Sequence, residues 1–156
     1  MAIAVLEECR DYRLGSVGSV LAIAWYSELT IAALDAIQKH EDALADRHGK
    51  ITLVSIILGA TAAPLPEIRE RMRKESSELE KRRLGNFIVV RTRGLSAIIA
   101  RSFLAAMSLM STIEVPATLE AAATAVRALA GQNAAIANDA TLGAELEAFA
   151  ELPRPA

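Results

Sequence analysis

The side chains that carry out chemistry in enzymes are few in this sequence and do not cluster. His40 and His48 are the two histidines, and they lie too far apart on one predicted helix to chelate a single metal ion. Cys9, the single cysteine, has no second cysteine with which to form a disulfide or a thiolate metal site. Catalysis needs a convergent set of groups, such as a nucleophile with its base. We therefore expect no enzyme activity, no cofactor and no metal, and a protein that acts by binding.

The loop after a strongly apolar stretch, residues 51–58, is a candidate partner-binding site. Thr61 is the one residue of this loop that could accept a phosphate, and prolines after it favour the start of a helix. That helix, residues 67–84, mixes both charge signs around a thin apolar stripe. It is either a docking surface for a charged partner or a solvated outer face held by i,i+4 ion pairs. The candidate partner-binding residues are Thr61, Pro64, Glu67 and Arg71.

Arg101 is the single charge in an otherwise small and apolar stretch, residues 95–111. A buried arginine requires a partner, so its guanidinium either extends to the surface or pairs with a carboxylate across a subunit contact. The alanines around it permit close packing on a sheet or on another chain. The candidate interface residues are Arg101, Ala97 and Met107, and a homo-oligomer would form if this helix associates with a second copy.

Length and composition indicate one domain. The chain has 156 residues, of which 53% are apolar and 23% charged, enough for a sizeable core. Its formal net charge of −2 favours neither nucleic acid nor an anionic membrane as a partner. No run reaches the roughly 18 uninterrupted apolar residues of a spanning helix, and Glu7 and Glu8 break the apolar start too early for a signal peptide. We expect a cytoplasmic protein without membrane insertion.

The apolar runs predict a layered fold. Residues 20–26, 51–58 and 87–90 are apolar without alternation, which is typical of strands that are buried on both faces. We predict an edge strand at residues 8–14, a turn at 15–18 and a short strand at 112–115. Helical spacing and breakers predict helices at residues 30–48, 67–84, 95–111, 118–130 and 144–152.

Capping residues set several of these boundaries. Thr30 and Thr118 are N-cap candidates, Gly49 suits the left-handed position after the first helix, and Gly85 is expected to end the second. The third helix is apolar on nearly every side and is therefore expected in the core. Residues 1–131 form the predicted domain, and residues 132–156 form a helical tail that is partly disordered at its end.

The predicted order, β-β-α-β-α-β-α-β-α, gives a single α/β domain with a mixed, mostly parallel sheet and helices packed on it. The stretches Arg13-Leu14-Gly15 through Trp25, residues 51–58, and residues 87–115 followed by Thr118-Leu119-Glu120-Ala121-Ala122 carry a resemblance to a known family. In order and in local sequence, residues 12–130 resemble the STAS family, to which bacterial anti-sigma-factor antagonists belong. The resemblance implies a signalling role, as a regulatory or scaffolding module that binds a protein partner.

One segment departs from the family pattern. Family switch proteins carry an acidic residue, a phosphorylatable serine and glycines in the loop after the central strand, whereas this loop offers Thr61 alone. Two other functions stay open. One is self-association through the apolar helix or the alanine-rich C-terminal segment, and the other is binding of a small apolar ligand near Trp25 and residues 107–110.

Overall fold

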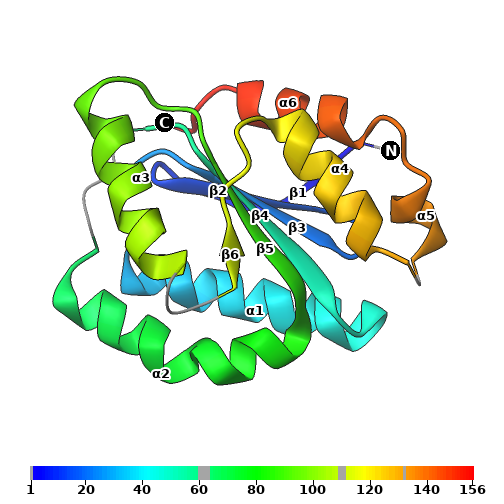
Figure 1. Ribbon diagram of the computed structural model, residues 1–156, viewed down its shortest axis with the longest axis horizontal. Coiled ribbons are helices and arrows are strands. Elements are labelled where there is room, and N and C mark those ends of the chain that lie inside the picture. The colour runs from blue at the N-terminus through cyan, green and yellow to red at the C-terminus, as the bar shows by residue number, and fades with distance from the viewer. Residues whose placement is uncertain (1, 60–63, 109–111, 132) are drawn as a thin grey trace.

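The strands form one mixed sheet. They are β1 (Ala4–Glu8), β2 (Tyr12–Val17), β3 (Val20–Trp25), β4 (Ile51–Ile57), β5 (Arg83–Val90) and β6 (Ile113–Glu114), hydrogen-bonded in that order (Figure 1). The first three strands are antiparallel neighbours, and β3 to β6 run parallel. The computed structural model describes residues 2–59, 64–108, 112–131 and 133–156. The prediction of a single α/β domain with a mixed sheet is confirmed.

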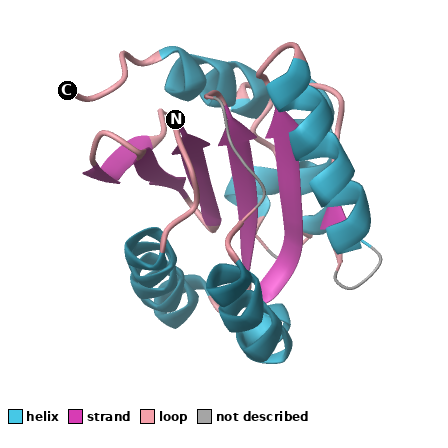
Figure 2. Cartoon of the chain, turned by 90° about the vertical axis from the view of Figure 1, so that its left-hand side faces the viewer, coloured by secondary structure: helices cyan, strands magenta, loops and turns pink. Residues whose placement is uncertain are grey.

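Helices cover both faces of this sheet. They are α1 (Ile31–His48), α2 (Pro66–Arg82), α3 (Leu95–Ser108), α4 (Leu119–Leu129), α5 (Ala134–Ala137) and α6 (Leu142–Glu151). Each of α1, α2 and α3 connects two adjacent parallel strands, and right-handed crossovers in one direction place all three on one face. Figure 1 shows α4, α5 and α6 along the opposite side, and the side view of Figure 2 shows helices above and below the strands.

The predicted caps of two helices are confirmed. The Thr30 and Thr118 hydroxyls accept hydrogen bonds from the backbone N–H groups of Ala33 and Ala121, each at 3.1 Å. Gly49 follows α1 with a φ of +79°, a conformation that glycine adopts without strain. Local signals of this kind act over three or four residues, which is why α1 and α4 begin where the sequence predicts.

The bounds predicted for the first strand and for the turn after it are wrong, although β2 and β3 do form an antiparallel hairpin. Residues 4–17 form two strands, β1 and β2, instead of one edge strand at 8–14. The turn lies at Gly18 and Ser19, with a φ of +53° at Gly18, and Val17 pairs directly with Val20. Gly15, predicted in the turn, lies inside β2, where an added Cβ would meet Phe149 of α6 at 2.7 Å. This glycine therefore serves close packing, a role that its local sequence does not reveal.

The predicted end of the second helix is also wrong. The α2 helix ends at Arg82 and β5 begins at Arg83, although the sequence predicts helix to residue 84 and a strand only from residue 87. Gly85 lies inside β5 and does not cap the helix. An added Cβ there would come within 2.8 Å of Leu129, so this glycine lets α4 approach the sheet.

The third predicted helix is not buried all round. Its inner residues Ala97, Ala100 and Leu104 pack against β5, but Leu95 and Ile98 are 72% and 61% exposed. The helix lies at the side of the sheet that ends in the edge strand, β6 (Figure 1). Arg101 lies on the exposed surface.

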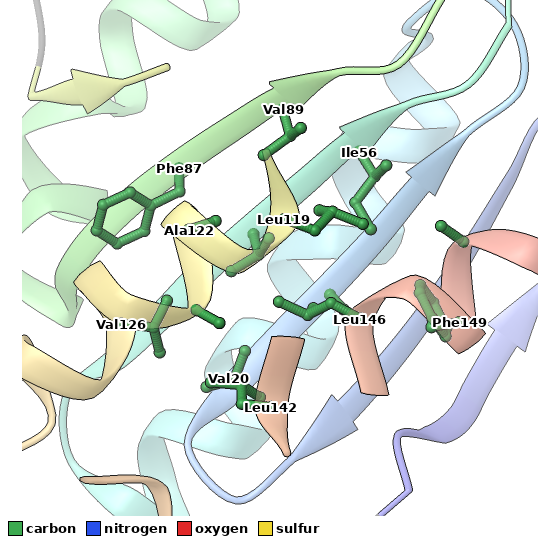
Figure 3. Packing of buried hydrophobic residues seen from close by; sticks show 14 of the residues in the cluster. Val20, Ile56, Phe87, Val89, Leu119, Ala122, Val126, Leu142, Leu146 and Phe149 are labelled. Carbon is green, nitrogen blue, oxygen red and sulfur yellow. The ribbon is translucent and has the colours of Figure 1, made fainter. Parts of the chain in front are cut away.

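The largest core cluster lies between the sheet and α4, α5 and α6. Its labelled members in Figure 3 are Val20, Ile56, Phe87, Val89, Leu119, Ala122, Val126, Leu142, Leu146 and Phe149. Three of these come from α6, which the sequence places in a peripheral tail. Full burial of one such side chain stabilises the fold by about 1.5–3 kcal/mol. Leu129, near the end of α4, is 42% exposed.

The chain end after α6 lies against a buried arginine. Arg13 donates hydrogen bonds to the Tyr26 hydroxyl at 2.7 Å and to the carbonyls of Leu152 and Pro153 at 3.3 and 2.7 Å. Its Nε also bonds Glu8 Oε2 at 2.7 Å. The backbone just after α6 is thus held by the Arg13 side chain of β2, next to the last residues, for which the sequence predicts disorder.

Candidate functional site

A cavity of about 170 Å³ lies between the sheet and the three helices α1, α2 and α3. It exists because α2 packs poorly on the sheet. Ile68 is the one buried residue among its seventeen, and charged residues occupy most of the other positions. A helix with so thin an apolar stripe cannot fill the space beneath it.

Alternate residues of the parallel strands form the floor of the cavity. The floor residues are Ile23 and Trp25 of β3, Leu53, Ser55 and Ile57 of β4, Asn86 and Ile88 of β5, and Ile113 of β6. The residues between them point to the opposite face, where Val54, Ile56, Phe87 and Val89 join the core under α4 and α6. The cavity and the main core therefore lie back to back across the sheet.

Three helices form the walls, and two loops form the rim. The wall residues are Leu34 and Ile37 of α1, Met72 of α2, and Ile99, Ala100, Phe103 and Leu104 of α3. Ser27, Leu29 and Pro64 lie in the segments that follow β3 and β4. The rim is thus at the carboxyl edge of the parallel strands, the edge at which open α/β sheets bind ligands.

Two uncharged polar side chains interrupt the apolar floor. Ser55 is 7% exposed, and its side chain lines the cavity. The Asn86 carboxamide oxygen is buried without a hydrogen-bond partner in the described part of the chain. Buried polar groups are normally paired, so this oxygen beside the cavity is unusual.

The charge nearest the cavity is already neutralised. Arg83 lines the cavity and bonds Glu41, whose side chain is 0% exposed, through Nε to Oε2 at 3.2 Å and through Nη2 to Oε1. The pair connects the start of β5 to α1. It is a buried ion pair with two hydrogen bonds, the geometry in which a buried pair is tolerated.

Ion pairs attach α2 to α1. Arg71 Nη1 lies 2.6 Å from Asp35 Oδ1, and Arg71 Nη2 donates to Gln38 Oε1 at 3.3 Å. The Asp35 hydrogen bond raises the pKa of Arg71 above its usual value. Arg82 pairs with Asp42 farther along the same two helices. Asp35 of α1 thus makes an ion pair with α2.

The predicted partner-binding residues lie at the start of α2 where the structure describes them. Pro64 lies on the cavity rim, Glu67 is exposed in the first turn of α2, and Arg71 makes contacts to α1. Thr61 lies outside the described residues. Their role in binding a partner stays a prediction.

The predicted interface residues are separated. Ala97 is buried against the sheet, whereas Arg101 lies beside a shallow hollow formed by α3 and the segment from Ile113 to Ala117. The Met107 side chain lies outside the described residues. Leu95 and Ile98 are exposed apolar residues of α3, although sequence patterning predicted this helix in the core.

The sequence indicated part of the cavity but missed its polar groups. Trp25, near which the sequence suggests binding of a small apolar ligand, does line the cavity. For Ser55 the sequence predicts only a place in a strand, and for Asn86 only a place just before one. The available signal was a serine in the middle of an otherwise apolar strand, ITLVSIIL, and an asparagine one residue before the Phe87 run.

A second group of titratable side chains lies away from the cavity, between β1, β2 and α1. Glu7 accepts a hydrogen bond from the Tyr12 hydroxyl at 3.0 Å and contacts His40 Nε2 at 2.8 Å. The hydrogen bond with His40 lowers the pKa of Glu7, and burial raises that of Tyr12 to about 12. Where the structure is described, three or more metal-ligating side chains nowhere come together.

Comparisons with known proteins add no family to these observations. Within the described residues, no helix combines the length and apolar character needed to cross a bilayer. The chain matches no protein-family model, and the searches of curated proteins and of solved structures give no match either.

Proposed function

We propose that this protein is a non-catalytic binding domain that holds a small apolar ligand in the cavity beneath α1, α2 and α3. The single observation that carries the proposal is the cavity itself, about 170 Å³ with a predominantly apolar lining. Protein interiors are normally close-packed. The unfilled space beside these apolar side chains offers a ligand apolar surface against which to bury itself. An apolar cavity of about 150 Å³ is sufficient to bind benzene.

The attachment of α2 supports this proposal. Because ion pairs with partly exposed members join α2 to α1, α2 can move without exposing a large apolar surface. Pro64 and Ser27 place the rim next to the start of α2. Movement of this helix would open the cavity at the edge where α/β sheets bind ligands.

Filling the cavity tests the proposal. Methylcyclohexane is a suitable probe, and Trp25, the one tryptophan in the sequence, reports its entry by fluorescence. The Ala100→Leu substitution places three more carbon atoms in the wall, so we expect at least tenfold weaker binding and a higher melting temperature. Ala128→Leu, on the exposed side of α4, is the matched control and should leave binding unchanged. A folded wild-type protein that binds no probe would contradict the proposal.

A second candidate function is a regulatory or scaffolding interaction module, as the resemblance to the STAS family implies. The observation that favours it is the exposed apolar pair Leu95 and Ile98 on α3. Large exposed apolar side chains grouped on one helix often mark a contact with a protein. Because the other side of α3 lines the cavity, a bound ligand could alter this contact.

Self-association is the form of this second function that the chain alone can test. Sedimentation velocity over a hundredfold concentration range should show a dimer that Ile98→Glu abolishes. Thr124→Glu, on the exposed surface of α4, is the control. A wild-type monomer at every concentration would remove self-association from the candidates.

A further inference from the structure

The polar groups of the cavity floor define the ligand more closely. We infer that the cavity selects a neutral ring compound carrying one hydroxyl group, which hydrogen-bonds to Ser55 and Asn86. This inference rests on the proposed ligand-binding function of the cavity and specifies its ligand.

Ser55 supplies the first polar contact. It lies in the middle of β4, and its side chain faces the cavity because Leu53 and Ile57, two residues to either side, also line it. It is 7% exposed, so a partner inside the cavity would bond it away from bulk water. A ligand hydroxyl suits this position, because each hydroxyl both donates and accepts.

Asn86 supplies the second contact, on the neighbouring strand. In the β4–β5 register Leu53 pairs with Asn86 and Ser55 pairs with Ile88, so Ser55 and Asn86 are diagonal neighbours on one face. The Asn86 carboxamide oxygen is buried without a partner, and the side chain lines the same cavity. A carboxamide carries a donor and an acceptor. One ligand hydroxyl placed between the two side chains can therefore bond both.

The cavity offers no unpaired charge to an ionised ligand among its described lining residues. Arg83 is the charged residue among the described lining residues, and both hydrogen bonds recorded for its guanidinium go to the buried Glu41. A carboxylate or an ammonium group in the cavity would lose its hydration without gaining a free counter-charge. A neutral polar group incurs a much smaller desolvation cost.

The remaining lining sets the size and shape of the apolar part. Apart from Ser27, Ser55, Arg83 and Asn86, the cavity is lined by apolar side chains from the sheet and from α1, α2 and α3. Its volume of about 170 Å³ is close to that of cavities that bind a single six-membered ring. The structure thus favours a compact cyclic alcohol or phenol over a long acyl chain.

Four probes of similar size test the inference: cyclohexanol, methylcyclohexane, cyclohexanecarboxylate and cyclohexylammonium. Calorimetry and Trp25 fluorescence give a dissociation constant for each. The decisive quantity is the ratio of the methylcyclohexane constant to the cyclohexanol constant. We expect Ser55→Ala and Asn86→Leu each to lower this ratio about three- to tenfold relative to the wild type. The exposed Ser102→Ala should leave it unchanged.

The outcomes separate this inference from the proposed function. If the wild type binds both neutral probes but neither variant changes the ratio, the hydroxyl site is wrong and the apolar cavity stands. Binding of cyclohexanecarboxylate as tight as that of cyclohexanol would overturn the neutral ligand and assign the recognition to Arg83. If no probe binds the folded wild type, both proposals fail. Ser55→Ala removes a single oxygen, so its result does not depend on whether Asn86→Leu folds.

Discussion

At the scale of single residues, the Arg83–Glu41 ion pair decides the stability of the cavity side of the sheet. Glu41 is fully buried and is the counter-charge of Arg83. Removing one member of a buried pair leaves the other charge without compensation, which costs more than the pair itself contributes. Glu41 also compensates the positive charge of Arg83 at the cavity. The same ion pair therefore affects both the stability of the fold and the charge of the ligand that the cavity would accept.

We expect Glu41→Gln to lower the free energy of unfolding by about 3–5 kcal/mol. Urea denaturation monitored by circular dichroism measures the change. Glu78→Gln is the matched control, because Glu78 and Lys81 form a pair that is largely exposed, and its effect should stay below about 1 kcal/mol. Equal effects of the two substitutions would show that the Arg83 charge reaches solvent.

Tyr12 gives the fold a dependence on alkaline pH. Burial and the hydrogen bond to Glu7 raise the pKa of Tyr12 from 10 to about 12. Since the unfolded chain ionises first, stability that depends on neutral Tyr12 is fully present below pH 10 and is lost as the pH rises from 10 to about 12. This loss amounts to at most about 2.7 kcal/mol.

We expect Tyr12→Phe to be less stable than the wild type at pH 7 by about 1 kcal/mol, because it lacks the hydrogen bond to Glu7. Between pH 10 and 12 the difference should shrink, since phenylalanine does not ionise. Urea titrations at pH 7, 10 and 11 measure it. A difference that stays constant over this range would mean that the Tyr12 hydroxyl ionises as it does in the unfolded chain.

At the scale of elements, α2 is joined to the rest of the molecule differently from the other long helices. It has one buried apolar residue, and its contacts to α1 are ion pairs through Arg71 and Arg82. Salt weakens exposed ion pairs, whereas it does not weaken apolar packing. The α2 helix should therefore open more readily than α1 or α4.

We expect Arg71→Gln to speed amide hydrogen exchange in α2 while lowering the global free energy of unfolding by no more than about 1 kcal/mol. In the wild type, 1 M NaCl should act in the same direction. Arg73→Gln is the control, because Arg73 pairs with Glu70 inside α2 and does not reach α1. Equal exchange in α2 for the two variants would contradict the role of Arg71 as a link between the helices.

The elements also show what the sequence could predict. The starts of α1 and α4 followed from Thr30 and Thr118, because a cap depends on neighbouring residues alone. The positions of Gly15 and Gly85 inside strands could not be inferred, since both glycines accommodate side chains from distant helices. The outward side of α3 was missed for a related reason. Apolar periodicity does not reveal whether a helix lies at the edge of a sheet or at its centre.

At the scale of the whole molecule, the layers were predictable and the cavity was not. Uninterrupted apolar strands require cover on both faces, so helices on each side of the sheet follow from the sequence. Whether those helices fill the space depends on the fit of side chains from many segments, such as Met72, Phe103 and Trp25. Ser55 and Asn86 are candidate ligand contacts only because this fit leaves a cavity beside them. The candidate site therefore emerges from tertiary packing and not from a motif.

The C-terminal segment is predicted to be peripheral, but in the structure it forms part of the core. Patterning placed residues 132–156 in a tail, but Leu142 and Leu146 of α6 are fully buried in the core under α4. We expect Leu146→Ala to lower the free energy of unfolding by about 2–5 kcal/mol in one cooperative transition. Leu152→Ala, just beyond α6 and partly exposed, should change it by less than about 1 kcal/mol. A Leu146→Ala protein that kept the wild-type urea midpoint would show that α6 does not stabilise the core. The core packed on the other face of the sheet, behind the cavity floor, would then depend on α4 and α5.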